Sequence, residues 1–461
     1  MKASEQVIVR IAPSPTGWFH VGTLRTALFN YLYARGHKGT FLLRVEDTDK
    51  ERSLPEYTDD IISSLEWLGL SYDERSTQSE HVARHRAVLE DLIAKNLAYV
   101  SNEREVSRET VSAKADMENR RESVIRFRNP GKVVTFHDLI LGDISVDTTD
   151  LGDFVIAKDL DTPLYNFVVV VDDIDMHITQ VIRGQDHIAN TPRQILIYEA
   201  LGAVVPEFAH IPLIMAPDKT KLSKRKHAEI VSIKSFRERG YLPEALINFF
   251  ALLGWNPGTE REMFSLQELV ENFSIEKVQK SSAVFNIDKL DWFNKEYIKK
   301  LSHEAQEEAI LEFLPESIKT LSGFSIERLH DIVPIIVDHV SKWSDVHTMA
   351  DAGELAYFFD APNCTAEQLI WKNSVRENAA KHLEDVAVKL EAMNSAHWNA
   401  ELVKEEIMPY AEEVGKGNVL WPMRVALSGK DKSPDPFTLA GVLGRDETLQ
   451  RIHSAIEILQ S

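Results

Sequence analysis

The sequence is poor in the features that mark secreted and membrane proteins. It has a single cysteine, Cys364, in 461 residues, which excludes an internal disulfide and a cysteine-cluster zinc site. No apolar run approaches the roughly 20 residues of a membrane-spanning helix. No apolar segment of the signal-peptide type precedes the first expected strand at residues 7–11. We therefore expect a cytoplasmic protein.

Basic residues are also in short supply. The chain has 52 lysines and arginines against 72 aspartates and glutamates, a formal net charge of −20. Nucleic-acid-binding proteins usually carry a basic surface, so this balance argues against such binding. The argument is weak, because a local basic strip can coexist with an acidic bulk.

The order of apolar runs predicts the fold class. A chain of this length exceeds one core, and three or four domains are expected. Buried strands at 7–11 and 40–45 alternate with amphipathic helices, which argues for a parallel, doubly wound α/β sheet. The helices are expected at 24–34 (ended by Gly36), 55–69 and 80–96.

The pattern changes after residue 100. Residues 101–122 are polar and predict a surface helix, and short strands follow at 124–128, 133–136, 143–146 and 154–157. The α/β pattern resumes with the apolar run 164–173. Residues 178–182 then predict another buried strand, 193–201 a helix and 208–215 a strand.

Helical patterns run from residue 241 to the end. We expect an α/β catalytic domain split by an α+β insertion and followed by an all-α region. The predicted boundaries are 1–99 and 164–240 for the two catalytic halves, 100–163 for the insertion, 241–304 for a helical junction, and 305–461 for the C-terminal helical region.

The loop between the first strand and the first helix carries the first candidate site. It contains Pro13, His20, Gly22 and Thr23. A strand, a Gly/Pro loop with a histidine, and a helix N-terminus together form an anion site. The imidazole can lie beside a phosphate, and Gly22 allows an adenine ring to approach the backbone. For this short motif alone, a surface histidine in a turn is the simpler alternative.

Two charged loops follow other predicted strands. Glu46 and its acidic neighbours follow the strand at 40–45, and Arg183 to His187 follow the strand at 178–182. Open α/β sheets bind ligands just beyond the carboxyl ends of their strands. A polar loop that caps the next helix is the alternative.

A basic cluster lies about 200 residues after His20. Lys221, Lys224, Arg225 and Lys226 surround Leu222 and Ser223. Such a loop can neutralise the charge that develops on a triphosphate as pyrophosphate leaves. A solvated basic patch is the alternative.

These motifs together resemble the class I aminoacyl-tRNA synthetases. The family's H-I-G-H and K-M-S-K-S motifs appear as His20–Thr23 and Lys221–Arg225, each with a different last residue. Four flanking segments look like bacterial glutamyl-tRNA synthetase: 10–17, 44–49, 170–173 and 181–187. The resemblance covers most of residues 7–300 and continues weakly at 421–429.

The resemblance implies a fold and a set of partners. It implies a split Rossmann-like domain, an insertion that holds the tRNA acceptor stem, and C-terminal helices that read the anticodon. The expected partners are ATP, L-glutamate and tRNA(Glu), with nucleotide-bound Mg²⁺ and no metal held by the protein itself. Some members bind zinc through cysteines in the insertion, which this chain lacks, so no zinc is expected. The enzyme is expected to be a monomer that binds neither DNA nor a membrane.

The resemblance also assigns residues. Glutamate is expected to contact Arg10, Ser14, Glu46, Tyr165, Arg183 and His187. The catalytic group is expected to be His20, Gly22, Thr23, Lys221 and Lys224. The ATP site is expected to include Pro13, His20, Gly22, Leu222, Ser223, Lys224 and Arg225.

Three positions depart from the family pattern. Gln185 replaces a usual Glu, Asp159–Asp161 replaces a Ser-Asp-Gly turn, and Leu164 replaces a Thr before Tyr165. These changes put the fine placement of the substrate pocket in question and leave the reaction class unaffected.

Three rival identities follow from the same motifs. Glutaminyl-tRNA synthetase typically has Pro-Pro-Glu-Pro-Asn where this chain has Ala12–Thr16. A truncated glutamyl-transferring paralogue lacks the C-terminal helices. A non-catalytic tRNA-binding relative is disfavoured by the intact set His20, Glu46, Arg183 and Lys224.

Overall fold

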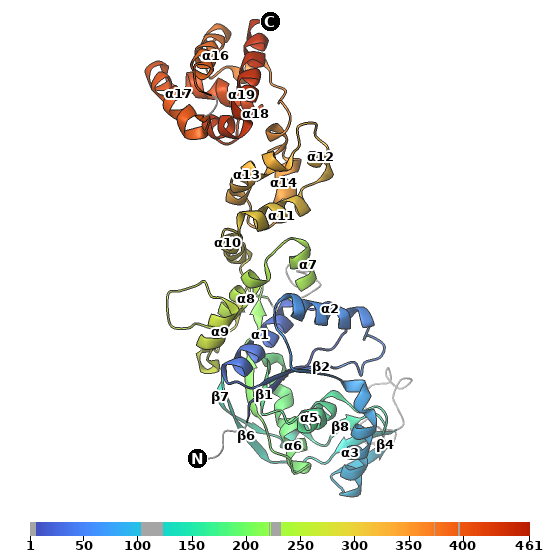
Figure 1. The fold of residues 1–461 in the computed structure, drawn as a ribbon. Coiled ribbons are helices and arrows are strands. Elements are labelled where there is room, and N and C mark those ends of the chain that lie inside the picture. Colours follow the sequence, from blue (N-terminus) through green and yellow to red (C-terminus); the bar gives the residue numbers. More distant parts are fainter. Residues whose placement is uncertain (1–5, 103–122, 221, 223–231, 373, 395–396) are drawn as a thin grey trace. The chain divides into compact units, whose positions relative to one another are not determined.

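The computed structural model describes residues 6–102, 123–220, 222, 232–372, 374–394 and 397–461. It divides into two compact units, Met1–Phe293 and Asn294–Ser461 (Figure 1). Most of the polar segment expected to be a surface helix, 103–122, lies outside the described residues, as does most of the basic cluster at 221–226.

The first unit is built mainly on parallel strands, with β7 antiparallel to β6 at one edge. One set has the order β1-β2-β3 and the other β7-β6-β10-β9. The N–H of Thr179 donates to the carbonyl of Ile8 at 2.9 Å, which joins the start of β9 to β1. The parallel α/β sheet expected from the sequence is therefore confirmed. Its strands are β1 (Ile8–Ile11), β2 (Thr40–Val45), β3 (Glu74–Thr77), β9 (Gln180–Gly184), β10 (Glu207–Ile211), β6 (Val133–Asp138) and β7 (Gly142–Asp147).

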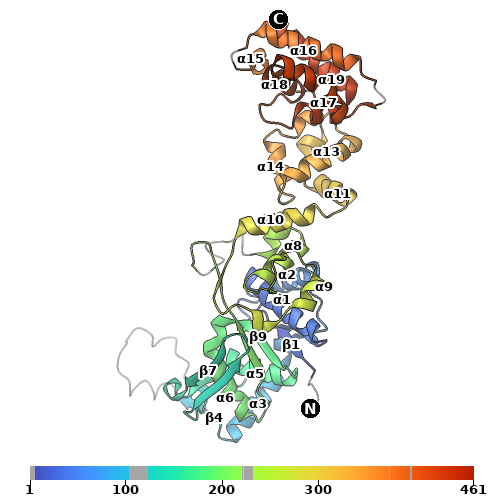
Figure 2. The same ribbon diagram turned by 90° about the vertical axis from the view of Figure 1, so that its left-hand side faces the viewer.

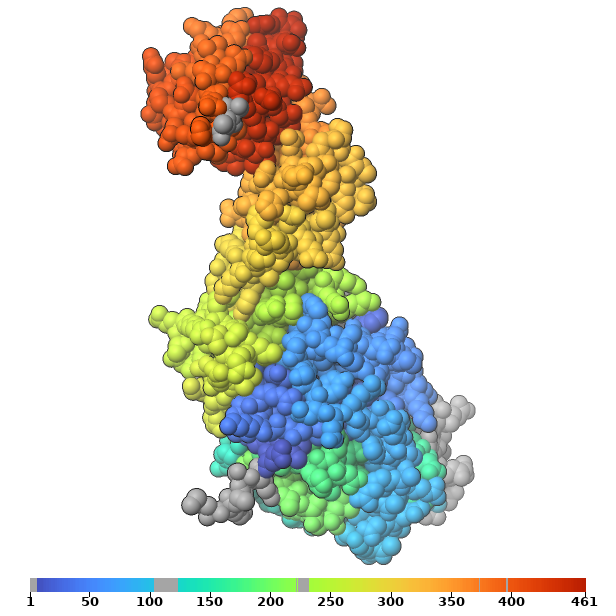
Figure 3. All heavy atoms as spheres, in the orientation of Figure 1, coloured from blue at the N-terminus to red at the C-terminus, as the bar shows by residue number. Residues whose placement is uncertain are grey.

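Helices cover both faces of this sheet, as a doubly wound fold requires. α1 packs on β1, β2 and β9, while α3, α5 and α6 lie across the opposite face (Figures 1 and 2). The first hundred residues cover much of one side of this unit, with residues near 255–275 beside them (Figure 3). The helices are α1 (Val21–Gly36), α2 (Pro55–Trp67), α3 (Val82–Ala94), α5 (Tyr165–Asp175) and α6 (Thr191–Ala200).

Local propensity is overridden in α5. Four consecutive valines, Val168–Val171, are helical although β-branched residues favour strands. All four are buried in the core shared with β5, β6 and β8, so packing outweighs intrinsic preference.

One other local expectation is corrected. The strand expected at 208–215 is two strands, β10 and β11 (Ile214–Met215), separated at Pro212, which has no N–H for a ladder. Helix α1 does end at Gly36, as expected, and the residue with a left-handed backbone just beyond it is Lys38, with a φ of 55°. A Cβ on Gly36 would lie 3.1 Å from the carbonyl oxygen of Val270, so a close approach accounts for this glycine.

The insertion is continuous with the catalytic core. β4 (Ala98–Asn102), β5 (Ser123–Phe127) and β8 (Phe154–Ala157) form a small antiparallel sheet. The β6–β7 hairpin instead extends the main sheet, where Asp138 pairs with Phe208 of β10. The short strands expected here are confirmed, the expected helix lies almost wholly outside the described residues, and the boundaries at 100 and 163 stay predictions.

After β11, the rest of the first unit is mainly helical, and its short strand β12 (Ala283–Val284) pairs with β11. The helices are α7 (Ile233–Glu238), α8 (Pro243–Leu252), α9 (Leu266–Asn272) and α10 (Ile287–Ile298), which continues into the second unit.

In the second unit, every regular element among the described residues is helical. α16, α17 and α18 each pack against α19, around buried Leu383, Val403, Met423 and Ile452. The helices are α11 (His303–Phe313), α12 (Glu316–Lys319), α13 (Ile326–His339), α14 (Asp345–Asp351), α15 (Ala366–Leu369), α16 (Arg376–Glu391), α17 (Ala400–Val414), α18 (Lys416–Ser428) and α19 (Pro436–Gln460). Across the described parts of both units, no helix is long and apolar enough to cross a membrane.

Candidate active site

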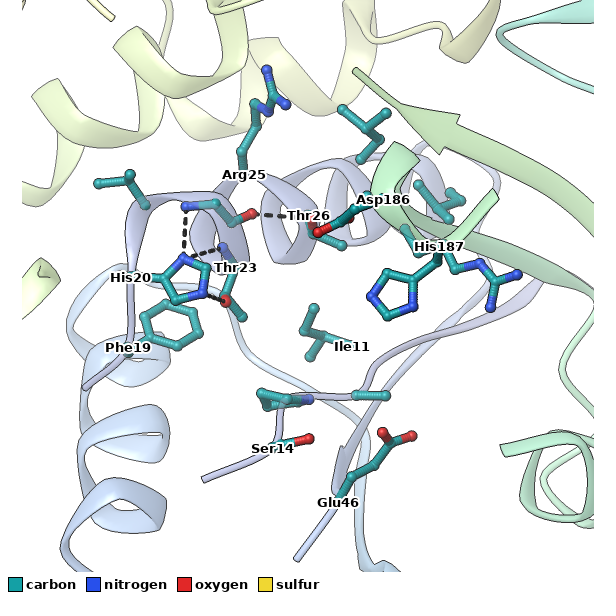
Figure 4. Close-up of a pocket in the computed structure, with 18 of the residues that line it drawn as sticks. Ile11, Ser14, Phe19, His20, Thr23, Arg25, Thr26, Glu46, Asp186 and His187 are labelled. Atoms are coloured by element: carbon teal, nitrogen blue, oxygen red, sulfur yellow. Dashed lines mark hydrogen bonds between the residues drawn. The ribbon is translucent and has the colours of Figure 1, made fainter. Parts of the chain in front are cut away.

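A cavity of about 550 Å³ opens where β1 and β9 end, within the size range of small-molecule sites. Its wall is formed by the loop after β1, the start of α1, the first turn of α5, and the loops after β9 and β10. In Figure 4, Ser14 and Glu46 lie on one side, His187 on another, and His20 at the far end. The cavity therefore lies at the sheet edge where open α/β folds bind ligands.

His20 caps helix α1. Its backbone is extended (φ −118°, ψ 161°), and its Nδ1 accepts the N–H groups of Gly22 at 3.1 Å and Thr23 at 3.2 Å. Because Nδ1 accepts, Nε2 carries the proton and donates to Thr23 Oγ1 at 3.1 Å. The helix N-terminus that the sequence predicted as an anion site is thus covered by the imidazole of His20 (Figure 4).

Gly22 makes this cap possible. A Cβ at position 22 would lie 3.1 Å from both Cε1 and Nδ1 of His20, closer than ordinary van der Waals contact. The structure therefore gives Gly22 a role in holding the histidine. The expected approach of adenine to Gly22 stays a prediction.

Arg25 anchors α1 from the other side of the cavity. Its guanidinium is buried and donates to the carbonyl oxygens of Leu253, at 3.2 Å, and Pro212. Burial lowers the pKa of Arg25 to about 9. These bonds fix the helix that carries His20 to the loop after β10.

A buried ion network supports one side of the cavity. Arg10 donates to both carboxylate oxygens of Asp173, at 3.0 and 3.3 Å. Arg44 reaches the same Asp173 at 2.6 Å and Glu46 at 3.1 Å. The network unites β1, β2 and α5, so it also fixes the strand ends that shape the cavity.

Burial and charge act in opposite directions on these carboxyls. Burial raises the pKa of Asp173, but Arg10 and Arg44 outweigh it, and the net pKa lies below its ordinary value. For Glu46, burial outweighs the attraction of Arg44 and Arg10, so its pKa is raised. A cation beside Glu46 would therefore find a carboxylate whose charge is poorly compensated by the protein.

Arg183 is held without an acid. Its Nε–H donates to His210 Nε2 at 3.2 Å, and its Nη2 donates to Thr191 Oγ1 at 2.8 Å. Its Nη1 is buried and has no hydrogen-bond partner. Burial lowers the pKa of Arg183. Arg183 also lines the cavity, and a guanidinium with unused N–H groups is a suitable donor for an anionic group.

Tyr165, the first residue of α5, forms a polar pair with His187. The phenol oxygen lies 3.0 Å from His187 Nδ1. Burial raises the pKa of Tyr165. Burial, followed by the charge of Arg183, lowers the pKa of His187. Both groups are thus neutral hydrogen-bonding groups near pH 7.

The structure brings most of the predicted site residues to this one cavity. The six expected glutamate contacts, Arg10, Ser14, Glu46, Tyr165, Arg183 and His187, all line it, as do Pro13, His20, Gly22, Thr23 and Leu222. Lys221, Ser223, Lys224 and Arg225 lie outside the described residues. The N–H of Ile233 donates to the carbonyl of Phe19 at 3.0 Å, so the described chain on both sides of 223–231 meets the cavity region.

The three departures from the family pattern have local roles. Leu164 is the N-cap of α5 and provides no side-chain cap bond. Asp159 accepts the N–H of Asp161 at 3.0 Å, and Asp161 pairs with Arg86 at 2.8 Å. Gln185 begins a short 3₁₀ turn. None of these side chains is among the described residues that line the cavity.

Sequence reasoning missed several supporting residues. The motifs at 44–49 and 170–173 contain Arg44 and Asp173 but give them no role, and the sequence assigns no part in the site to His210, Thr191 or Asp138. A charged residue inside an apolar strand, as at Arg44, is the one signal available, because burying a charge is costly without a partner. The identity of that partner is not visible in the sequence.

One group of side chains in the second unit has a composition that metals accept. His303, Glu307 and His330 place their ligand atoms within 4.8 Å of one another. His330 Nδ1 bonds directly to Glu307 at 2.6 Å, and His303 Nε2 lies 3.1 Å from the carbonyl of His330. These hydrogen bonds account for the cluster without an ion.

Comparison with known proteins places the chain in a class. The family "tRNA synthetases class I (E and Q), catalytic domain" matches residues 6–109 and 101–292, and "Anticodon binding domain" matches residues 327–456. With the parallel sheet and the cavity beside His20, these matches define a class I aminoacyl-tRNA synthetase.

Individual relatives narrow the class. The chain is 42% identical to the glutamate--tRNA ligase of Geobacter sulfurreducens, over 98% of this chain and 99% of the relative. It is 38% identical to that of Carboxydothermus hydrogenoformans, over 97% and 99%. A crystal structure of a glutamate tRNA ligase from Elizabethkingia meningosepticum, in complex with its amino acid, matches with a TM-score of 0.85 at 32% identity, over 99% of this chain and 100% of that one. This chain belongs to the glutamate--tRNA ligase family, and the resemblance read from its motifs is confirmed.

Proposed function

We propose that this chain joins L-glutamate to the 3′ end of tRNA(Glu) through a glutamyl-adenylate, consuming ATP and releasing AMP and pyrophosphate. One observation carries the proposal: a single cavity gathers Arg10, Glu46 and Arg183 with the His20 cap of α1. Charged groups for an amino acid thus lie beside His20, the residue that we assign to the phosphates of ATP. The rival reading as a glutaminyl-tRNA synthetase is not favoured, since the relatives described above are glutamate ligases.

The charges of the cavity suit glutamate, which has two carboxylates and one ammonium. Arg183 offers its unpartnered Nη1 to a carboxylate, and Arg10 contributes from within its pair with Asp173. Glu46 pairs with the α-ammonium. Ser14, Tyr165 and His187 complete the pocket with hydrogen bonds. Substrate binding would then satisfy buried groups that are costly to leave unpaired.

Activation needs positioning rather than a side-chain nucleophile. The α-carboxylate attacks the α-phosphorus of ATP, and pyrophosphate leaves. His20, held by Gly22 and Thr23, faces the phosphates, and Pro13 and Leu222 bound the nucleotide.

The basic loop completes the ATP site. We assign Lys221 and Lys224 to the leaving pyrophosphate and Ser223 and Arg225 to the nucleotide. The position of Leu222 on the cavity wall and the bond from Ile233 to Phe19 support this assignment. Mg²⁺ would be held by the phosphates and supply further positive charge. A Lys224→Ala variant should cut activation sharply, and a rate within about twofold of wild type would refute the role of this loop.

Transfer follows at the same cavity. The 2′-hydroxyl of the terminal adenosine attacks the adenylate, with the acceptor stem held by the insertion at 100–163. The region matched as an anticodon binding domain, 327–456, would read the anticodon, where unstacked bases are accessible. We keep 1–99, 164–240, 241–304 and 305–461 as the boundaries of the other proposed domains.

The test is aminoacylation with purified glutamate and glutamine tRNAs, offering each amino acid in turn. We expect glutamate on tRNA(Glu). Charging with glutamine in preference to glutamate would overturn the proposal. The amount of glutamate placed on tRNA(Gln) measures whether the enzyme discriminates between the two tRNAs.

A second assay concerns the order of steps. We expect glutamate activation to need bound tRNA, as family resemblance implies. Pyrophosphate exchange with glutamate at full rate without tRNA would contradict this expectation.

Light scattering and metal analysis of the purified protein test the expected zinc-free monomer, and cell fractionation tests its cytoplasmic location. Filter binding with DNA and flotation with vesicles test the expectation that it binds neither DNA nor a membrane.

A further inference from the structure

Behind Arg183 lies a polar cluster that does not face the cavity. Asp138, Thr191 and His210 are each 0% exposed. They come from three elements, β6, α6 and β10, and meet beside the guanidinium of Arg183 on β9. Fully buried polar groups are costly unless each is satisfied, so their arrangement must be specific.

The hydrogen bonds fix the tautomer of His210. Arg183 Nε–H can only donate, so His210 Nε2, at 3.2 Å, must accept. The proton of the neutral ring is then on Nδ1 and is donated to Asp138 Oδ2 at 2.6 Å. Thr191 Oγ1 accepts from Arg183 Nη2 at 2.8 Å, so its own hydroxyl proton points to His210 Nε2 at 3.0 Å.

Asp138 is itself held rigidly. Its Oδ1 accepts the N–H groups of Ile140 at 3.0 Å and Leu141 at 2.8 Å, in the turn between β6 and β7. Its Oδ2 accepts the backbone N–H of His210 at 3.1 Å as well as the ring. The carboxylate therefore joins the hairpin turn to β10 and leaves the imidazole one orientation.

We propose that Asp138 and His210 are positioning residues for the amino-acid step: they hold the Nδ1–H tautomer of His210, which orients the guanidinium of Arg183 toward a substrate carboxylate. The inference rests on the proposed function of Arg183 and adds the residues that orient it. Nε and Nη2 of Arg183 each donate to a neutral acceptor, so the N–H groups that remain are left for the substrate.

The cluster also keeps the charge of Arg183 available. Neither His210 nor Thr191 neutralises it, and Asp138 acts only through the imidazole. Burial lowers the pKa of His210 and the charge of Arg183 lowers it further, against the opposing effects of Asp138 and Asp186. A protonated His210 would direct an N–H at the N–H of Arg183 and disturb its aim.

The decisive variant is Asp138→Asn, which keeps the size of the side chain. Its Oδ1 still accepts from Ile140 and Leu141, while its amide donates to His210 Nδ1 and moves the ring proton to Nε2. The amide cannot accept the backbone N–H of His210, so that bond is lost as well. The wrong tautomer then opposes Arg183. By analogy with other outer partners of oriented ligands, we expect the KM for glutamate to rise about 10- to 100-fold. The KM for ATP should stay within about twofold.

A matched control variant and a double-mutant cycle separate an effect on the position of Arg183 from an effect on folding. Asp175→Asn makes the same chemical change at an exposed pair with Arg84 and should leave both KM values unchanged. In an Arg183→Gln background, Asp138→Asn should add nothing to the KM for glutamate, because the group that it positions is gone. His210→Gln, which returns an acceptor toward Arg183, should be milder than Asp138→Asn and substitutes for it if that variant does not fold.

Spectroscopy gives an independent readout. The ¹⁵N shifts of histidine-labelled protein should show His210 with its proton on Nδ1, and on Nε2 after Asp138→Asn. The proposal is overturned if folded Asp138→Asn keeps the KM for glutamate within twofold, or raises both KM values equally. Unchanged glutamate kinetics in Arg183→Gln would instead refute the role of Arg183, and a wild-type enzyme that does not charge glutamate would refute the proposed function.

Discussion

The two arginines of the cavity are held in opposite ways. Arg10 and Arg183 are almost equally buried, at 3% and 6% exposure. Arg10 meets the carboxylate of Asp173 in a two-pronged ion pair. Arg183 donates hydrogen bonds to the neutral Thr191 and His210 and lies over the ring of Phe208, 5.5 Å from its centroid. One charge is compensated inside the protein, and the other is not.

This difference indicates which arginine reads the substrate. A buried cation without an acid is expensive, and a protein that keeps one gains nothing in stability. A substrate carboxylate would supply the missing partner. Under the proposed function, we therefore expect Arg10 to act mainly as part of the scaffold that fixes β1 and Arg183 to be the main contact for a substrate carboxylate. The sequence had suggested equal roles for both.

The largest expected effect comes from removing Asp173, the acid that compensates Arg10. Asp173→Asn leaves Arg10 and Arg44 without their shared carboxylate, and loss of one partner of a buried pair costs about 3 to 5 kcal/mol. Urea unfolding should show this loss in the free energy of unfolding. The exposed Asp175→Asn should cost less than about 1 kcal/mol, and equal effects would contradict the comparison.

Substitution of Arg183, the arginine without an acid partner, should lower activity and leave stability largely unchanged. Arg183→Gln removes a charge that has no acid partner, so the free energy of unfolding should change little or rise. Loss of its contact with the substrate should cost about 2 to 5 kcal/mol, or roughly 30-fold or more in kcat/KM for glutamate. Aminoacylation kinetics and urea unfolding of the same preparation measure both. A variant that is strongly destabilised but active would reverse our assignment.

A smaller effect is expected at the phosphate end. Gly22→Ala would press a Cβ against the His20 ring at 3.1 Å and move the cap of α1. Alanine also favours the helix by about 1 kcal/mol, so stability should change by less than that. Pyrophosphate exchange should fall by about tenfold, less than the roughly 100- to 1,000-fold loss seen when a group that stabilises charge is removed, because the imidazole is displaced and not removed. Full activity with an unmoved KM for ATP would count against the role of the cap.

The smallest effect is a pH dependence. Burial holds the pKa of His210 below its ordinary value of 6.5, among Asp138, Arg183 and Asp186. The unfolded chain then binds more protons just below pH 6.5, so stability is lost as the pH falls through this window. The loss is no more than about 1.4 kcal/mol per pH unit for one proton.

His210→Gln isolates this proton from the other histidines. The stability of wild type relative to this variant should shrink between about pH 7.5 and 5.5 in urea titrations. A difference that grows toward low pH would mean that His210 is protonated in the folded protein.

Sequence was sufficient where chemistry and position coincide. Arg10 lies in β1, Ser14 and His20 follow that strand, and Glu46 follows β2, so strand ends alone brought them together. The acidic loop after β2 also has a structural role. Asp47 accepts the backbone N–H and the hydroxyl of Ser79 at 2.9 and 2.6 Å, which ties this loop to the short turn after β3. Glu46 is then the residue of this loop that lines the cavity.

Sequence was insufficient where partners lie far apart along the chain. Arg44 and Asp173 are 129 positions apart, and Asp138 and His210 are 72 apart. Neither pair follows from a local pattern, because the sheet topology creates it. The helical conformation of the valines in α5 does not follow from local sequence for a related reason. The buried environment that overrides their propensity is assembled from distant strands.

The most direct measurement is a crystal structure of this chain with L-glutamate bound. Our account predicts a substrate carboxylate oxygen about 2.7 to 2.9 Å from Nη1 of Arg183, with the Arg10–Asp173 pair intact and the ammonium at Glu46. Glutamate bound with both carboxylates away from Arg183, or with Asp173 released from Arg10, would contradict it.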